Sequence, residues 1–101
     1  MNDDLYRDAE RALHALAEEY ASYHHAIDQE IAARRAADRL GAIQLRQALD
    51  GEPIDSAEDV RCRARLLRTI ASAQESLRRV KRWHHEAVVA IADYLRALEE
   101  K

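Results

Sequence analysis

The chain has only one place where helix-breaking residues gather, the segment DGEPIDS at residues 50–56. This segment contains the single proline, Pro53, and one of the two glycines, Gly51, of a sequence of 101 residues. Proline and glycine are the residues that a helix interior tolerates least. A single such cluster near the middle of the chain favours two long helices joined by one turn. We predict an all-α fold, a long antiparallel helical hairpin of the coiled-coil type.

The composition supports long helices and limits the core that they can form. Twenty residues are alanine, none is phenylalanine, and 35% of the chain is charged. Alanine has the highest helix propensity but little side-chain surface to bury, so a short chain of this kind closes only a thin core by itself. We predict a single helical-hairpin domain, residues 1–101, that buries further surface against a partner.

The turn and the residues beside it set the expected boundaries of the helices. We predict a helix over about 3–40, a turn at 50–56 and a helix over about 57–99. Ser56 is the expected N-cap of the last helix, because its hydroxyl can accept a hydrogen bond from a backbone amide of the first turn.

The segment around Gly41 allows two interpretations. Glycine is common just after the end of a helix and costly inside one, so we expect Gly41 to end the first helix. The following residues AIQLRQALD then form a short separate helix at about 42–50. The alternative is one continuous helix that turns a second apolar face toward another subunit, because the apolar stripe of the first helix breaks after Ile31.

The last helix carries a continuous repeat in which steps of three and four residues alternate. Its members are Val60, Arg63, Leu67, Ile70, Gln74, Leu77, Lys81, His84, Val88, Ile91, Leu95 and Leu98. The average spacing of 3.5 residues is that of helices that supercoil around a neighbour. The first helix has a matching stripe, made of Leu5, Ala9, Leu13, Leu16, Tyr20, Tyr23, Ile27 and Ile31. We expect these two stripes to face each other in the hairpin.

A second apolar line lies beside the repeat on the last helix, at Val80, Trp83, Ala87, Ala90 and Tyr94. A helix with two adjacent apolar faces contacts two neighbours, so we predict a homodimer that forms a four-helix bundle. The expected interface residues are Leu13, Leu16, Tyr20, Tyr23, Ile27, Val80, Trp83, His84, Val88, Ile91, Tyr94 and Leu95. The predicted function is that of a non-enzymatic protein–protein interaction module, acting as an adaptor, scaffold or inhibitor.

Charge is distributed unevenly along the chain, whose net charge is −3. Residues 60–82 hold eight basic residues and one acid, whereas residues 1–30 hold two basic residues and eight acids. Clustered arginines on a helix can contact phosphates. The alternative function is therefore that of a nucleic-acid-binding accessory protein, with the candidate anion-binding residues Arg61, Arg65, Arg68, Arg78, Arg79 and Arg82. The acidic net charge and ion pairing with nearby carboxylates argue against this alternative.

Four of the five histidines form two adjacent pairs, one of which begins at His24 and the other at His84. A turn centred near residue 53 brings these two residues within about one helical turn of each other. Because His24 and Asp28 share a helix face, a metal-binding bundle at His24, Asp28 and His84 is a third, weaker interpretation. Adjacent residues on a helix point about 100° apart, and the Glu-x-x-His motif of di-iron bundles is absent. We expect no metal and no cofactor.

No catalytic motif is present in the sequence. It lacks a glycine-rich phosphate loop and a nucleophile elbow, and Cys62 is interpreted as a small apolar helical residue. No run of eighteen apolar residues is present, so we expect no membrane partner. The acidic N-terminus is unlike a secretory signal, and one cysteine fits a reducing compartment. We therefore expect a cytoplasmic protein.

Overall fold

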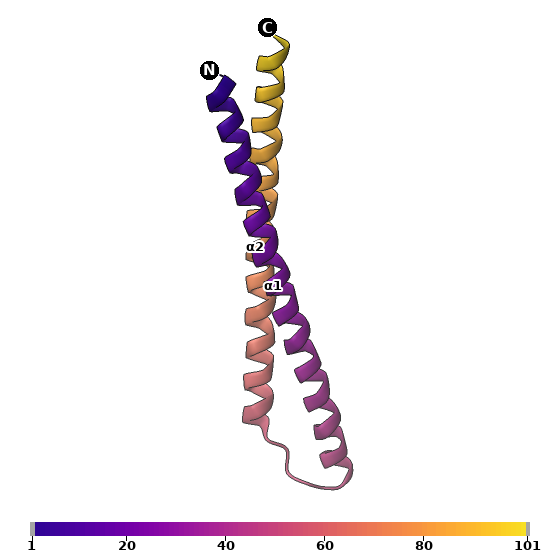
Figure 1. Cartoon of the computed structure of the whole chain (residues 1–101). Helices are drawn as coiled ribbons and strands as arrows, with labels where there is room; N and C mark the ends of the chain where they lie inside the picture. The colour runs from indigo at the N-terminus through magenta and orange to yellow at the C-terminus, as the bar shows by residue number, and fades with distance from the viewer. Residues whose placement is uncertain (1, 101) are drawn as a thin grey trace. The chain divides into compact units, whose positions relative to one another are not determined.

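The computed structural model describes residues 2–100 and consists of two helices in a hairpin (Figure 1). Helix α1 spans Asn2–Leu49, 48 residues, and helix α2 spans Ser56–Glu99, 44 residues. The predicted all-α hairpin is confirmed, and the predicted limits of the last helix are correct to within one residue. Neither helix contains, over the described residues, a stretch long and apolar enough to cross a membrane.

Helix α1 continues without interruption through Gly41, so the expected short separate helix at 42–50 is wrong. A glycine inside a helix costs only about 1 kcal/mol relative to alanine. Alanine, glutamine, leucine and arginine dominate the segment after Gly41, and their high helix propensity offsets this cost. The half-buried positions Leu40, Gln44 and Gln47 also keep the same helical spacing on both sides of the glycine.

The glycine that ends α1 is Gly51, whose backbone φ of 72° lies in the left-handed region. Its amide donates to the carbonyl of Ala48 at 3.2 Å, and the amide of Glu52 donates to the carbonyl of Gln47 at 2.8 Å. These two hydrogen bonds form a Schellman motif, which satisfies carbonyl groups that a helix end leaves unpaired. The capping role that the sequence analysis gave to Gly41 therefore belongs to Gly51.

Asp55, rather than the predicted Ser56, caps the N-terminus of α2. Its Oδ1 accepts hydrogen bonds from the amides of Ala57 at 3.0 Å and Glu58 at 3.1 Å. A carboxylate at this position satisfies two otherwise unpaired N–H groups and also interacts favourably with the helix dipole. This advantage of a charged oxygen explains why the cap lies one residue before the predicted serine.

The facing sides of the helices follow one repeat of alternating steps of three and four residues, which we call the seam. On α1 the seam comprises Asn2, Leu5, Ala9, Ala12, Leu16, Glu19, Tyr23, Ala26, Glu30, Ala33, Ala37, Leu40, Gln44 and Gln47. On α2 it comprises Asp59, Cys62, Leu66, Thr69, Ala73, Ser76, Val80, Trp83, Ala87, Ala90, Tyr94 and Ala97. Every one of these residues is buried or half-buried.

On α2 the seam lies one residue before the repeat that the sequence analysis selected, so that assignment is wrong. Val60, Leu67 and Val88 are exposed by 64%, 67% and 53%. The second apolar line, which was expected to contact a partner, is instead part of the seam, and its member Val80 is only 5% exposed. The seam at Ala73, Ser76 and Ala87 consists of small residues, which allow two helix backbones to approach closely.

The buried core is small because it consists almost entirely of alanine. Its apolar members are Ala9, Ala12, Ala26, Ala33, Ala73, Val80 and Ala87, and Ser76 is also buried. None of the described residues is a large side chain that is fully removed from solvent. Hydrophobic stabilisation scales with buried apolar area, so this core contributes little to the stability of the hairpin.

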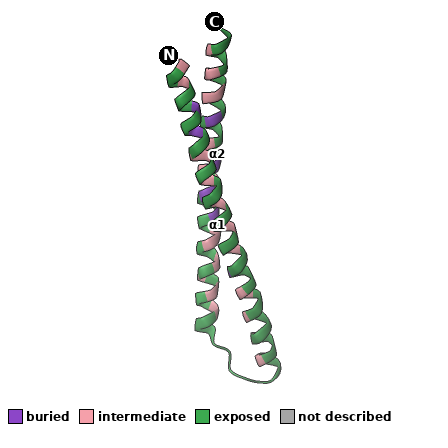
Figure 2. Ribbon diagram, in the orientation of Figure 1, coloured by how far each residue is buried: buried purple, intermediate pink, exposed green. Residues whose placement is uncertain are grey.

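The contacts within the chain cluster into two compact units. Among the described residues, unit 1 comprises residues 2–24 and 75–100, and unit 2 comprises residues 25–74. Unit 1 contains five of the eight buried residues and unit 2 contains three. Within unit 2 no residue from 34 to 72 is buried, and the helices near the turn carry only exposed and half-buried residues (Figure 2).

Candidate interaction surfaces

The seam divides the surface of each unit into two sides. In heptad letters the seam residues are a and d, with Leu5 and Trp83 at d, and the residue after each d is e. In an antiparallel pair the e positions of both helices flank the seam on one side and the g positions flank it on the other. The ring of Tyr6, at e, packs edge-to-face on that of Tyr94 with 5.6 Å between the centroids. This contact places the e position of α1 directly beside the seam of α2.

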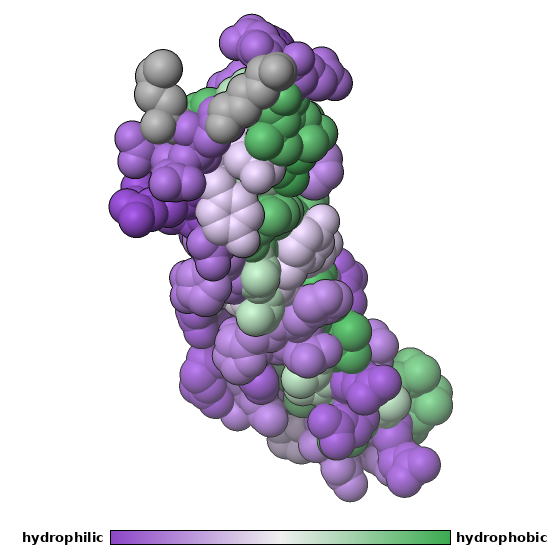
Figure 3. Space-filling view, turned by 45° about the horizontal axis from the view of Figure 1, so that its top comes forward, coloured by the Kyte–Doolittle hydropathy of each residue, from purple (hydrophilic) through white to green (hydrophobic). Residues whose placement is uncertain are grey.

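The e side of unit 1 carries large apolar side chains from both helices, at e and at the neighbouring b positions. We call this surface the apolar face and define it by six residues that are each 43–53% exposed: Tyr6, Leu13, Tyr20, Val88, Leu95 and Leu98. Figure 3 shows strongly hydrophobic and near-neutral side chains gathered over unit 1. The e positions of this unit hold no Asp, Glu, Lys or Arg, and one of them is His84. The face is therefore apolar and almost uncharged at its centre.

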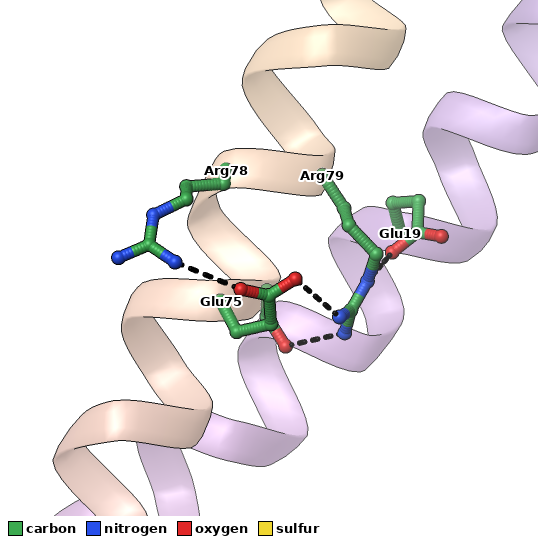
Figure 4. Close-up of polar contacts among 5 residues, drawn as sticks. Glu19, Glu75, Arg78 and Arg79 are labelled. Atoms are coloured by element: carbon green, nitrogen blue, oxygen red, sulfur yellow. Dashed lines mark hydrogen bonds and ion pairs between the residues drawn. The ribbon is translucent and has the colours of Figure 1, made fainter.

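The opposite side of unit 1 is polar and contains a network of ion pairs (Figure 4). The Nε of Arg79 donates to Oε2 of Glu19 across the two helices at 2.9 Å, and Arg79 Nη2 donates to Oγ of Ser76 at 3.0 Å. Glu75 accepts from Arg78 at 2.8 Å and lies 3.7 Å from Arg79. Both guanidinium groups are thus already engaged by carboxylates of the same unit.

A shallow groove of about 280 Å³ opens on this polar side of unit 1. Three carboxylates, those of Asp8, Glu86 and Asp93, line it together with Trp83. The guanidinium of Arg82 lies 5.7 Å from the ring centroid of Trp83, a distance at which a cation is attracted to the face of an aromatic ring. Arg82 therefore also has a partner within the unit.

Unit 2 has a surface of different chemistry on its g side, which comprises positions c and g. We call it the basic side and define it by five exposed arginines: Arg39, Arg46, Arg61, Arg65 and Arg68. None of the five forms an ion pair with another residue in the range 2–100.

On the e side of unit 2, in contrast, both arginines at e positions are paired. Arg34 lies 3.6 Å from Glu30, and Arg63 lies 3.1 Å from Asp59. The arginines at the e positions are therefore paired with carboxylates, whereas those of the basic side are not.

The structure divides the twelve predicted interface residues between the seam and the apolar face. Leu13, Tyr20, Val88 and Leu95 lie on the apolar face, and His84 and the half-buried Ile91 occupy e positions within it. The predicted residues that lie on the seam are Leu16, Tyr23, Val80, Trp83 and Tyr94. Ile27 is half-buried in unit 2.

Tyr6 and Leu98, which were not among the predicted interface residues, also belong to the apolar face. Tyr6 lies seven residues before Leu13, so the heptad spacing of exposed tyrosine and leucine is the signal that identifies it. Leu98 belongs to the repeat that the analysis selected on the last helix, although it was not counted among the interface residues.

The six predicted anion-binding arginines separate in the same way. Arg61, Arg65 and Arg68 lie on the basic side of unit 2, whereas the three arginines of unit 1 already have intramolecular partners. Arg39 and Arg46, which the analysis missed, share the heptad position of Arg61 and Arg68 on the other helix. Their spacing of seven residues becomes informative only when the seam of α1 is known.

The low-probability metal candidates His24, Asp28 and His84 are all exposed. Among residues 2–100, no group of three or more His, Cys, Asp or Glu side chains is placed to hold a metal ion. The register of the helices also differs from the assumed one. A turn centred at residue 53 places Glu19 opposite residue 87, whereas Glu19 is bonded to Arg79.

No protein-family model, no curated protein sequence and no solved structure matches this chain.

Proposed function

We propose that this chain is a non-enzymatic helical interaction module that forms a homodimer through the apolar face of unit 1. In this proposal the dimer is a four-helix bundle over unit 1, and the assembly serves as an adaptor or scaffold for another protein.

The observation that carries the proposal is the distribution of large and small apolar residues. The seam buries alanines, whereas Tyr6, Leu13, Tyr20, Val88, Leu95 and Leu98 remain about half exposed on one side. Burying a large aliphatic or aromatic side chain stabilises by about 1.5–3 kcal/mol relative to leaving it exposed. The hairpin therefore leaves six large apolar side chains about half exposed on one side, and contiguous exposed patches of this kind mark interaction sites.

Two features favour a second copy of the chain as the occupant of this face. Every copy of the hairpin exposes the same apolar face, whatever other partner is present. A second copy is therefore always available to bury it. In addition, a twofold interface brings the same patch of both subunits together. A face without charged residues at its e positions can meet itself without repulsion between like charges, and two hairpins joined in this way form a four-helix bundle.

Adjacent valines on α2 provide a matched test of the dimer. Val88 lies on the apolar face and is 53% exposed, whereas Val89 lies on the polar side and is 44% exposed. The substitutions Val88→Ser and Val89→Ser have the same cost in helix propensity and nearly the same cost in the isolated hairpin. Only contact with a partner distinguishes them.

We expect light scattering during size-exclusion chromatography to give twice the protomer mass of 11.6 kDa at micromolar concentration. Val88→Ser loses apolar burial in both subunits, about 2 kcal/mol per dimer, and raises the dissociation constant roughly 30-fold. Val89→Ser leaves the dissociation constant unchanged in sedimentation equilibrium. A folded wild-type monomer at micromolar concentration, or equal effects of the two variants, contradicts the proposal.

A further inference from the structure

We propose that the basic side of unit 2 binds the phosphate backbone of a nucleic-acid duplex without reading its base sequence. This inference is independent of the dimer proposed above, because it concerns different residues in a different unit.

The five arginines of the basic side form no ion pairs within the described residues. Arg34 and Arg63, on the e side, lie within 4 Å of a carboxylate, whereas the five arginines of the basic side do not. A guanidinium is a planar, permanently charged donor that matches the oxygens of a phosphate. The basic side therefore presents five such donors that form no ion pair with any carboxylate among residues 2–100.

Four of the five arginines form two rows along the helices. Arg39 and Arg46 form one row on α1, and Arg61 and Arg68 form another on α2, each with a spacing of seven residues, or about 10 Å along the helix. Arg65 lies at the g position beside the second row. A duplex carries one phosphate charge per about 1.7 Å of its axis, so a length of about 10 Å offers roughly six phosphates.

Carboxylates are absent from most of the g side of unit 2. The c and g positions hold none between residues 29 and 46 of α1 or between residues 61 and 72 of α2. The acid closest in sequence, Asp38, occupies a b position and forms no ion pair within the described residues. Carboxylates reach the g side only at the turn end, at Asp50 and Glu58. Between these limits the c and g positions therefore present positive charge with no carboxylate among them.

The aromatic content of unit 2 favours a duplex over a single strand as the ligand. Proteins that bind single-stranded nucleic acids stack the bases on aromatic side chains. Unit 2 contains no Tyr, Trp or Phe, because the aromatic residues Tyr6, Tyr20, Tyr23, Trp83 and Tyr94 all belong to unit 1. The basic side thus has donors for phosphates but no aromatic surface for bases, and it fits a duplex whose bases remain paired.

The test measures fluorescence anisotropy of labelled duplexes of mixed sequence, one of DNA and one of RNA, over a series of salt concentrations. Five phosphate contacts predict a slope of log K against log salt of about −4 to −5 for DNA, with micromolar affinity at physiological salt. Binding of only one duplex identifies the source of the phosphate backbone, and binding of both shows that the backbone alone is recognised.

The matched variants are Arg61→Gln/Arg68→Gln on the basic side and Arg34→Gln/Arg63→Gln on the e side. Both remove two positive charges from unit 2, and circular dichroism verifies that both remain helical. We expect the first variant to bind roughly 10-fold or more weakly and to reduce the steepness of the salt dependence by about two. The second variant keeps the wild-type slope.

Results of three kinds overturn the inference. One is duplex binding that does not weaken as salt is raised, or no binding at low salt. Another is an equal loss of affinity in the two variants, which means that only the net charge of the chain matters. The third is tighter binding of a single-stranded oligonucleotide, or of polyglutamate at equal charge, than of the duplex, because the occupant is then a strand with free bases or an acidic protein.

Discussion

The two units share the same pair of helices and the same seam spacing. They differ in the side-chain contacts that connect one helix to the other. In unit 1 the helices are joined by the contact of Tyr6 with Tyr94 and by the hydrogen bond of Arg79 to Glu19. In unit 2 the described ion pairs and side-chain hydrogen bonds all connect residues within one helix or cap its end. Identical periodicity therefore gives two different kinds of packing.

The difference comes from the residues that occupy the seam. In unit 1 the seam is mainly Ala, Leu, Val, Tyr and Trp, whereas in unit 2 it includes Glu30, Gln44, Gln47, Asp59 and Thr69. Polar seam residues contribute less hydrophobic free energy and lose hydrogen bonds to water when they pack. We therefore expect unit 1 to be the more stable unit and unit 2 to open more often.

The largest effect is expected from a charge placed in the seam of unit 1. Ala87 is 3% exposed, so Ala87→Glu introduces a carboxylate with no positive partner in a packed position. The expected loss is about 4 kcal/mol in the free energy of unfolding, enough to separate the helices of unit 1. Urea denaturation followed by circular dichroism, at fixed protein concentration, measures this loss.

The control for this substitution is Ala92→Glu on the exposed surface of the same helix. We expect it to change the free energy of unfolding by less than about 0.5 kcal/mol. If both variants unfold at the same urea concentration, the packed seam of unit 1 is not what stabilises the hairpin.

The second prediction tests whether polar seam residues loosen unit 2. Gln44 is half-buried, and its Nε2 is shielded from solvent without a hydrogen-bond partner among the described residues. Gln44→Leu removes this unsatisfied donor and adds apolar contact, so we expect about 1–2 kcal/mol of added stability. Peptide-resolved hydrogen exchange shows which segment is stabilised. We expect slower exchange in residues 34–72.

The matched substitution Gln29→Leu replaces an exposed residue whose Nε2 lies 3.1 Å from the His25 ring nitrogen. Gln29→Leu buries no additional surface in the hairpin, so we expect little or no added protection from hydrogen exchange. Equal protection from both substitutions argues that helix propensity, rather than the seam, limits unit 2.

The sequence predicted the hairpin well because the signal for it is local. Gly51 and Pro53 stop any helix at the position where they stand, whatever the rest of the chain does. The position of the seam is not a local property. On α2 the line through Val60 and Leu67 and the line through Asp59 and Leu66 have the same spacing, and the first is the more hydrophobic. The choice between them depends on how closely two backbones can approach, which favours small residues.

The candidate surfaces were predicted only in part for the same reason. The repeat from Val60 to Leu98 was recognised in the sequence. Which of its side chains are exposed could not be predicted, because exposure depends on the position of the seam. Likewise, Arg61, Arg65 and Arg68 are visible as a cluster in the sequence, whereas Arg39 and Arg46 join them only through the pairing of the helices. A surface made by two helices can be predicted only when the register between the helices is known. The register that follows from a turn centred at residue 53 is wrong.

The third prediction compares the two glycines, both of which lie in unit 2. Nothing lies within 4 Å of a Cβ built on Gly41, and this residue is in the helix interior, so Gly41→Ala should stabilise by about 0.5–1 kcal/mol. Gly51 also has open space around it, but its φ of 72° is unfavourable for alanine. Gly51→Ala should therefore destabilise by about 1 kcal/mol. Thermal melts of the two variants should shift in opposite directions, and a loss of stability at Gly41 contradicts a continuous α1.

The smallest effect concerns the ion pair of Glu19 with Arg79, which joins the helices of unit 1. A double-mutant cycle with Glu19→Gln and Arg79→Gln isolates their coupling from the contacts of Arg79 with Glu75 and Ser76. These side chains are 23% and 42% exposed, so we expect a coupling of only about 0.5–1 kcal/mol, which decreases as salt is added. The pair of Glu30 with Arg34 in unit 2, at 3.6 Å within one helix, is the reference, with about 0.3 kcal/mol. If the coupling energy of the reference pair is as large, the ion pair between the helices stabilises no more than an ion pair within one helix. The greater stability of unit 1 must then come from its apolar seam alone.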